Sequence, residues 1–151
     1  MNKLLYILIA IAVIIVIAFF VLGMISKKGQ ALGLKEGHLQ ACISTENCVT
    51  SEVIDSHPAT IEPLTFSQEK LMFMDKLKTA IEAMGGEIVT SDSSYIASTF
   101  TSGVFGFVDD VEFRITDDQQ LHFRSSSRVG RKDFGANKKR IEQLKALLAD
   151  Q

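Results

Sequence analysis

The hydrophobic and polar positions divide the chain into three parts with different periodicities. The first part, residues 4–25 (LLYILIAIAVIIVIAFFVLGMI), contains no charged residue. As a helix rising about 1.5 Å per residue it would reach roughly 30 Å, the thickness of the hydrocarbon core of a bilayer. A signal peptide has a shorter apolar core followed by a small-residue cleavage site, for which only residues 21–23 are suitable. We therefore predict an uncleaved transmembrane anchor over residues 1–28, which contacts the lipid bilayer through residues 4–25.

The second part, residues 29–64, shows no sustained period. It holds both prolines of the chain, Pro58 and Pro63, and both cysteines, Cys42 and Cys48. Proline is typical of loops and breaks in regular structure. We predict an irregular linker or arm that leads away from the membrane, with a local turn between the cysteines.

The third part, residues 65–151, begins with a helical period. Thr65 and Gln68 form a capping-box signature, and the helical pattern ends at Gly85 and Gly86. The apolar positions recur at helical spacing; they are Leu71, Met74, Leu77, Ile81 and Met84. This pattern predicts an amphipathic helix whose apolar face packs into a core.

Four stretches with strand alternation follow, and a second helix ends the chain. The stretches are residues 87–91, 94–100, 105–115 and 120–126. The last helix carries Ile141, Leu144 and Leu148 on one face, with Asn137 as its N-cap. The order α-β-β-β-β-α predicts an α+β domain: a four-stranded antiparallel sheet with two flanking helices on its apolar face.

Alternation also assigns side chains to the two faces of this sheet. Asp109 falls on the apolar face, where a carboxylate is costly unless it is paired, so we expect Arg128 or Arg131 to pair with it. The polar face holds Asp110, Glu112, Arg114, His122 and Arg124. One face of an antiparallel sheet is commonly solvated, so ordinary cross-strand ion pairs are the first expectation for these residues.

The acidic hairpin also offers candidate catalytic residues, Asp109, Asp110 and His122. Carboxylates beside a histidine can hold a divalent metal or transfer protons. However, the sequence has no Gly-x-Ser-x-Gly elbow, HExxH pair or phosphate loop. An enzyme is therefore the secondary hypothesis.

A basic segment, residues 124–140 (RSSSRVGRKDFGANKKR), leads into the last helix. Cations, hydroxyl groups and a helix start are typical of an anion-binding site, although the same residues suit a solvated first turn. The candidate anion-binding residues are Arg124, Ser125, Ser127, Arg128 and Arg131. Structural roles are expected for Gly130, Asp133, Gly135 and Asn137.

The net charge argues against a nucleic-acid-binding protein. Three of the 16 Lys and Arg residues lie within residues 1–28, so 13 remain against 18 Asp and Glu in the rest of the chain. An acidic domain lacks the broad basic surface that nucleic acids require.

Cys42 and Cys48 are the only cysteines of the chain. A pair of cysteines just beyond a membrane anchor favours a disulfide in an oxidising compartment, which would place the C-terminal domain outside the cytoplasm. Zinc bound by both cysteines with His38 and His57 is an alternative, but a five-residue spacing is wide for a structural zinc site. Free thiols are the third alternative, and we expect no bound metal and no cofactor.

Two segments resemble the domain-of-unknown-function 1499 family of bacteria and plastids. GFVDDVEF (106–113) and residues 124–140 match its signature Gly-Phe-x-Asp-Asp-Val-Glu-Phe, then Arg-Ser-x-Ser-Arg-x-Gly-x-x-Asp-x-Gly-x-Asn-x-x-Arg. CISTENCVTS and HPATIEPL resemble its cysteine turn and its His-x-Ile-x-Pro-Leu stretch, but Ile43 and Glu46 replace the turn prolines and His57 is two residues early. The family has no accepted activity, so the resemblance implies a fold more than a function.

These observations favour a single-pass protein of the bacterial inner membrane with a periplasmic C-terminal domain. We expect a non-catalytic binding or accessory module of the cell envelope for an anionic group, such as a lipid headgroup or an envelope polymer, held by Arg124, Arg128 and Arg131. The alternatives are a small hydrolase or divalent-metal-dependent enzyme using the acidic hairpin, and a structural subunit that binds another protein.

Overall fold

The computed structural model describes residues 2–52 and 60–149. It contains three α-helices, a two-stranded sheet and a six-stranded sheet within these residues. The elements are α1 (Lys3–Ser26), β1 (Leu34–Lys35), β2 (His38–Leu39), β3 (Cys48–Thr50), β4 (Leu64–Thr65), α2 (Lys70–Ala83), β5 (Glu87–Ser91), β6 (Tyr95–Thr101), β7 (Val108–Ile115), β8 (Gln120–Ser127) and α3 (Ala136–Ala149).

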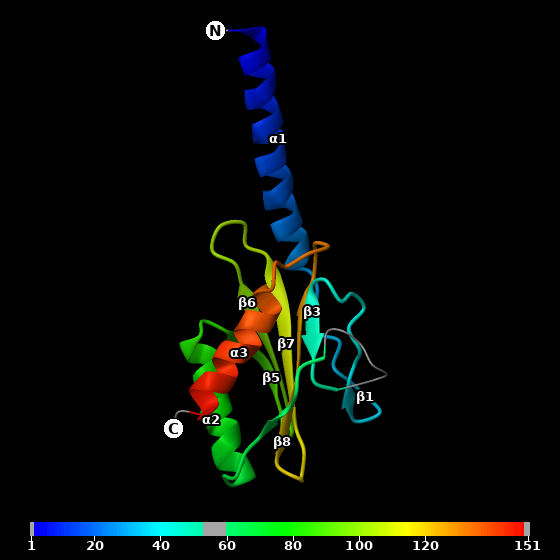
Figure 1. Ribbon diagram of the computed structural model, residues 1–151, viewed down its shortest axis with the longest axis vertical. Coiled ribbons are helices and arrows are strands. Elements are labelled where there is room, and N and C mark those ends of the chain that lie inside the picture. The colour runs from blue at the N-terminus through cyan, green and yellow to red at the C-terminus, as the bar shows by residue number, and fades with distance from the viewer. Residues whose placement is uncertain (1, 53–59, 150–151) are drawn as a thin grey trace.

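Helix α1 projects from one end of the folded domain (Figure 1). It is long and apolar enough to cross a membrane. Nearly all of its side chains are exposed, and only Gly23 and Ser26, in its last turn, are buried. The long helix predicted from residues 4–25 is therefore present, with its C-terminal end against the domain.

The six-stranded sheet has the order β3-β8-β7-β6-β5, and β4 pairs with the other end of β8. All of these named strand pairs are antiparallel. Helices α2 and α3 cover one face (Figure 1), and their apolar residues pack with those of the strands. The buried residues at the centre of this core include Leu77, Ile81, Val111, Phe113, Leu121, Phe123, Ile141 and Leu144.

The predicted α+β class is confirmed, but the predicted number of strands is wrong. The four expected strands are β5 to β8, and the two additional strands, β3 and β4, come from residues 29–65. They are only three and two residues long. Such short pairings carry no detectable alternation, so they form only because the arm returns to the edge of β8.

Both predicted helix starts also differ from the structure. Helix α2 begins at Lys70 rather than near Thr65, because Glu69 accepts hydrogen bonds from the Leu71 and Met72 backbone N–H groups. Helix α3 begins at Ala136, so Asn137 lies inside the helix. The Asp133 carboxylate, rather than the Asn137 side chain, accepts hydrogen bonds from backbone N–H groups at this helix start, those of Gly135 and Asn137.

The arm covers the face of the sheet opposite α2 and α3. Strands β1 and β2 form a small hairpin whose turn residues, Glu36 and Gly37, have positive φ angles of 53° and 81°. Leu39 is 1% exposed and packs on Tyr95 and Ala97 of β6. The sheet is therefore a middle layer between two helices on one side and the arm on the other.

Candidate functional site

The face of the sheet beneath the arm, called the arm face below, carries a row of buried ion pairs. The pair nearest α1 joins Arg128 to Asp110 through two bonds, Nε to Oδ2 at 2.9 Å and Nη2 to Oδ1 at 2.6 Å. Arg128 also donates from Nη1 to the backbone oxygen of Ser26 at 3.1 Å. One guanidinium group therefore joins the sheet to the last turn of α1.

The middle pair joins Glu112 of β7 to Arg124 of β8. These residues are direct cross-strand partners, with Arg124 Nη1 2.8 Å from Glu112 Oε2. Glu112 is 0% exposed and also accepts hydrogen bonds at 2.7 Å from the Tyr95 hydroxyl and the Gly33 backbone N–H. Burial first, and then this bond to Glu112, raise the pKa of Tyr95, so its phenol remains a donor. The predicted cross-strand pairing is present, but it is buried rather than solvated.

The third pair, farthest from α1, joins Glu52 of the arm to Arg114 of β7. Glu52 also accepts a hydrogen bond from the Leu39 backbone N–H at 2.5 Å. His122 lies beside this pair, with Nδ1 3.9 Å from Glu52 Oε1 and 3.4 Å from Ser51 Oγ. Burial lowers the pKa of His122 below its usual value, against the opposing effect of the Glu52 carboxylate.

The opposite face of the sheet holds a second polar cluster, under the start of α3. Asp109 does lie on this face, as alternation predicts, but its partner is Arg140 of α3 at 2.7 Å. The Arg140 guanidinium also lies over the Phe100 ring at 4.8 Å. The expectation that Arg128 or Arg131 pairs with Asp109 is therefore wrong.

Asn137, which is 0% exposed, is the centre of this second cluster. Its side-chain nitrogen donates to Asn47 O and Ser127 Oγ, both at 3.0 Å. Its side-chain oxygen accepts bonds at 2.6 Å from Ser125 Oγ and Arg140 Nη1. All four hydrogen-bonding positions of this amide are used, so Asn137 links α3, β8 and the arm.

The structure does not bring the three candidate catalytic residues together. Asp109 lies on the α3 side of the sheet and Asp110 on the arm face, because successive residues of β7 point in opposite directions. His122 is on the arm face, but four residues along β8 from Ser126, the cross-strand partner of Asp110. That separation is about 13 Å at the rise of an extended strand.

The candidate anion-binding residues are also divided. Arg124 and Arg128 lie on the arm face, whereas Ser125 and Ser127 bond to Asn137 on the other face. Arg131 extends from the loop after β8, where its side chain is 87% exposed and bonds to Glu46. Arg124, Ser127 and Arg128 nevertheless line one cavity together, whereas Ser125 and Arg131 are not part of its lining.

The four residues expected to be structural shape the loop between β8 and α3. Gly130 and Gly135 have positive φ angles of 91° and 82°, in the left-handed region that favours glycine. Gly130 also accepts a 2.6 Å bond from the Asn47 side chain. Asp133 and Asn137 hold the first turn of α3, as described above.

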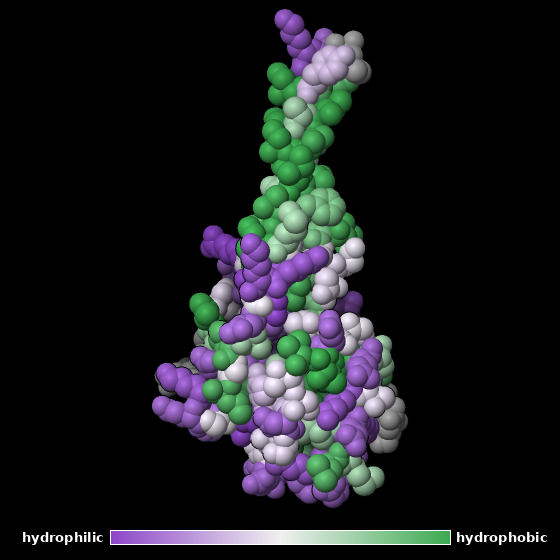
Figure 2. Space-filling view, turned by 180° about the vertical axis from the view of Figure 1, so that it is seen from behind, coloured by the Kyte–Doolittle hydropathy of each residue, from purple (hydrophilic) through white to green (hydrophobic). Residues whose placement is uncertain are grey.

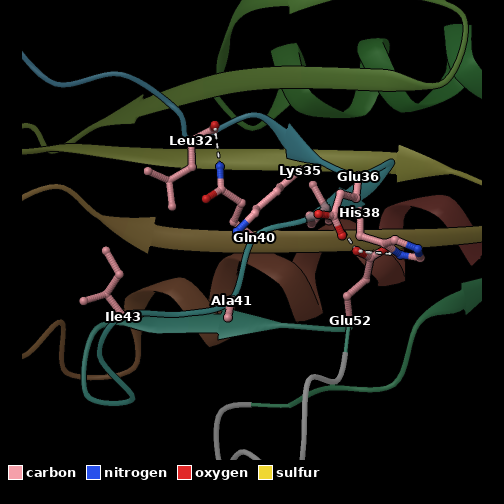
Figure 3. Close-up of a pocket in the computed structure, with 9 residues that line it drawn as sticks. Leu32, Lys35, Glu36, His38, Gln40, Ala41, Ile43 and Glu52 are labelled. Carbon is pink, nitrogen blue, oxygen red and sulfur yellow. Dashed lines mark hydrogen bonds and ion pairs between the residues drawn. The ribbon is translucent and has the colours of Figure 1, made fainter.

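Two adjoining cavities are lined by the arm, and the smaller of them also by strands of the sheet. The larger, about 650 Å³, is lined by the arm and has an apolar end at Leu32 and Ile43 and a polar end at His38, Glu36 and Glu52 (Figure 3). The smaller, about 200 Å³, lies next to the chain that follows α1; its lining includes Gly29, Gln30, Asp110, Arg124, Ser126 and Arg128. Leu32 and Ile43 line both cavities, so we call the two cavities together the arm groove.

One donor in the arm groove lacks a partner within the described part of the chain. Arg124 is 4% exposed, and its Nε has no hydrogen bond. A buried donor without an acceptor costs about 1–3 kcal/mol. Arg124 Nε is therefore a buried donor without an acceptor beside the smaller cavity, while Glu112 and Asp110 balance the charges of Arg124 and Arg128.

The cysteines are paired. The sulfur atoms of Cys42 and Cys48 lie 1.96 Å apart and the Cα atoms 5.7 Å apart, the geometry of the disulfide alternative. Sulfur atoms in this state are not thiolate ligands for zinc, and His57 lies outside the described residues. Among residues 2–52 and 60–149, no three His, Cys, Asp or Glu side chains are grouped to hold a metal ion.

Sequence reasoning missed Glu52, Tyr95 and the Gly33 N–H group as members of the arm face. Glu52 lies in the irregular arm, 62 residues from Arg114, so no periodicity connects them. The only available signal was Glu112 in a hairpin with Arg124 opposite, since a buried carboxylate requires several donors.

A search of the curated proteins found no match to this chain. A scan against protein families matched residues 38–148 to the family described as "Protein of unknown function (DUF1499)". This match covers most of the chain, including the arm face, the arm from His38 onward, and the loop before α3. The chain belongs to the DUF1499 family, as its two signature segments indicate.

Proposed function

We propose that this protein is a single-pass, membrane-anchored binding module of the cell envelope, and that its ligand is an anionic amphiphile such as an acidic phospholipid. Helix α1 anchors it in the bacterial inner membrane, and the C-terminal domain lies in the periplasm. The apolar part of the ligand occupies the larger cavity of the arm groove, and its anionic group lies near Arg124 and Arg128. No catalytic step is assigned to the domain.

The observation that carries this proposal is the arm groove itself. A volume of about 650 Å³ lies within the range of small-molecule sites in proteins. Leu32 and Ile43, which line both cavities, are 41% and 89% exposed, although both are large apolar residues. Apolar side chains left open beside a cavity are typical of a surface that another molecule covers.

The smaller cavity supports an anionic headgroup rather than a neutral one. Arg124 supplies the unpartnered Nε, and Arg128 is held beside it by Asp110. Because the net charge of these pairs is balanced, selectivity arises from donor geometry rather than from a strong positive field. A phosphate or carboxylate oxygen suits this donor better than a neutral carbonyl because a charged acceptor forms the stronger hydrogen bond.

The position of the arm groove supports a ligand taken from the bilayer. Gly29 and Gln30, in the wall of the smaller cavity, follow within four residues of the end of α1 at Ser26. One end of the groove therefore lies beside the membrane surface when α1 spans the bilayer. This favours a lipid over an envelope polymer.

The test is photo-crosslinking of the full chain in vesicles that contain phosphatidylglycerol with a photoactivatable group in its acyl chain. We expect crosslinks in residues 29–43 as well as on α1, which serves as an internal control. The change Ala41→Trp, in the wall of the larger cavity, should reduce crosslinking of the arm by about tenfold or more, equivalent to about 1.4 kcal/mol, because the indole fills the site.

Ala83→Trp is the matched control, because Ala83 is exposed on α2, on the other side of the sheet. It should crosslink like the wild type. A phosphatidylcholine probe tests the headgroup and should label the arm less. Equal labelling of the arm in the Ala41→Trp and Ala83→Trp variants, or labelling of α1 alone, would rule out the lipid site.

The hydrolase alternative has no comparable support. Asp109 and Asp110 each have an arginine partner on opposite faces of the sheet, and His122 lies about 13 Å along β8 from the position opposite Asp110. The described residues therefore present no shared point at which these three side chains meet one substrate.

A further inference from the structure

The loop between β6 and β7, residues 102–107, packs against the side of α1. The centroid of the Phe105 ring lies 5.1 Å from that of Phe19, on which it stacks, and 5.2 Å from that of Phe20, which it contacts edge to face. The Phe107 ring lies edge to face with the Phe19 ring, with their centroids 6.3 Å apart. Figure 1 shows this loop rising from the top of the sheet beside the lower end of α1.

The contact between the loop and α1 is close at the backbone. A Cβ atom added at Gly23 would lie 1.9 Å from the Phe105 carbonyl oxygen, so only glycine allows this approach. Below it, Ser26 Oγ accepts a hydrogen bond from the Val108 backbone N–H at 3.0 Å. These two contacts fix the position of the loop along the axis of α1.

The part of α1 that the loop contacts lies within the membrane if α1 spans the bilayer. The apolar run of residues 4–25 has 22 residues and is about 33 Å long as a helix, against about 30 Å for the hydrocarbon core. The apolar helix is therefore only about 3 Å longer than the hydrocarbon core, so it can shift along the membrane normal by no more than about this distance. Phe19 and Phe20 are six and five residues before Ile25, so they lie roughly 5–9 Å inside the hydrocarbon edge.

The loop has the chemistry of a segment that lies in the membrane interface. Residues 102–107 (SGVFGF) carry no charge, and Val104 is 73% exposed. Part of the polar backbone is bonded within the loop: Ser102 N–H to Phe107 O at 2.8 Å, and Gly106 N–H to Ser102 O at 3.1 Å. The Phe107 N–H donates to Ser102 Oγ at 2.9 Å. These internal bonds lower the cost of placing this part of the backbone in an apolar surrounding.

The boundary of this apolar surface is basic. Lys27 and Lys28 follow α1 directly and are exposed, and the Lys27 side chain lies beside Gly106. Figure 2 shows the hydrophobic surface of α1 continuing to the top of the domain, where hydrophilic side chains border it. Lysines in this position place their ammonium groups among lipid headgroups while their stems remain in the apolar layer.

We propose that the loop of residues 102–107 is a second membrane contact, with Val104 and Phe105 in the outer part of the acyl-chain layer beside α1. The occupant of this surface is lipid at the boundary between headgroups and acyl chains. The loop fixes the domain against the membrane instead of leaving it to swing on a single helix. This inference rests on the membrane anchoring by α1 proposed above.

The absence of tryptophan from the chain allows a direct test. Val104→Trp in the full chain introduces a single tryptophan at the exposed tip of the loop. The variant is reconstituted into vesicles of phosphatidylcholine and phosphatidylglycerol whose acyl chains are brominated near the carbonyl end, because bromine quenches tryptophan fluorescence at short range. Gly103→Trp gives a second position on the loop, since a side chain added there meets no atom within 4 Å.

Two further single-tryptophan variants are the controls. Met72→Trp replaces a side chain with a similar exposed fraction, 68%, near the start of α2 at the end of the domain far from α1 (Figure 1). Ile14→Trp places the probe in the middle of α1 and reports whether the helix spans the bilayer.

We expect the loop tryptophans to be quenched several-fold more than the tryptophan at position 72. Quenching at positions 103 and 104 no greater than at position 72, together with strong quenching of the position-14 tryptophan by lipids brominated deep in the acyl chains, would overturn the inference and leave the anchor intact. No quenching at position 14 would instead overturn the anchoring proposal, and with it the second contact.

Discussion

At the scale of single residues, the arm face depends on carboxylates that are each surrounded by donors. Glu112 is fully buried and has three partners from three different segments: Arg124, Tyr95 and the Gly33 N–H. Removing one member of such a group leaves a buried charge without compensation, which typically costs about 3–5 kcal/mol. By contrast, Arg131 and Glu46 form an exposed pair whose loss should hardly be detected.

His122 provides a pH-dependence prediction at this scale. Burial lowers its pKa in the folded state, so the unfolded chain takes up the proton first as the pH falls. The free energy of unfolding should therefore decrease as the pH is lowered from about 7 to 5, and it should be largest above the usual histidine pKa of 6.5. In a His122→Gln variant this part of the decrease should disappear.

The measurement is urea unfolding of the detergent-solubilised full chain, followed by circular dichroism across this pH range. The difference between wild type and variant removes the effect of the carboxylates and other histidines. The same slope in both proteins would mean that His122 has the same proton affinity in the folded and unfolded states.

At the scale of the elements, short irregular segments hold the layers together. The arm contributes β3 to the sheet, and the disulfide between Cys42 and Cys48 closes the turn before it. A bridge across so short a loop stabilises by about 2 kcal/mol, which keeps the arm over the charged face rather than stabilising the whole domain. In the same way, the loop of residues 102–107 joins the sheet to α1 through its contacts with Phe19 and Phe20.

Gly23→Ala tests the packing between α1 and this loop. The added methyl group would overlap the Phe105 carbonyl oxygen, so the loop must move away from the helix. The Val108 amide, which donates to Ser26 Oγ, should then exchange its hydrogen about tenfold faster or more, equivalent to about 1.4 kcal/mol. Hydrogen exchange of the full chain in detergent measures this rate.

Gly103→Ala is the control for this substitution, because a methyl group at that position has open space. It should leave the Val108 exchange rate unchanged. Unaltered exchange in the Gly23→Ala variant would show that the helix and the loop are not packed as described.

At the scale of the whole molecule, α1, the loop of residues 102–107 and the entrance of the arm groove all lie at one end of the domain. The Arg128 guanidinium connects α1 and the groove wall, because it bonds to Asp110 in that wall and to the Ser26 oxygen at the end of α1. The basic segment thus braces the fold through Arg128, while Arg131 and Lys132 remain on the surface with Glu46. The proposed binding function depends on this common placement, which lies beside the membrane if α1 spans it.

The orientation of the molecule can be tested through its two cysteines. If the domain is periplasmic and the disulfide is formed, a maleimide that cannot cross the inner membrane should label Cys42 and Cys48 in intact cells only after a reductant is added. Labelling that requires cell lysis would place the domain in the cytoplasm, and labelling without reductant would mean that the thiols are free.

Periodicity along the chain was sufficient to predict the long apolar helix, the two helices of the domain, four strands of the sheet, and the faces on which Val111, Asp109 and Glu112 lie. These features depend on residues within a few positions of one another, and their periods of 3.6 and 2 are visible in any short window. The family signature likewise required only the order of residues in two segments.

Only the tertiary structure decided which groups meet. Asp109 pairs with Arg140 and not with Arg128 because α3 returns to its face, and Glu52 meets Arg114 because the arm folds back over β7. Strands β3 and β4 exist for the same reason, and so does the arm groove. Partners separated by 31 to 102 residues come together through chain reversals and sheet register, and a local pattern contains neither.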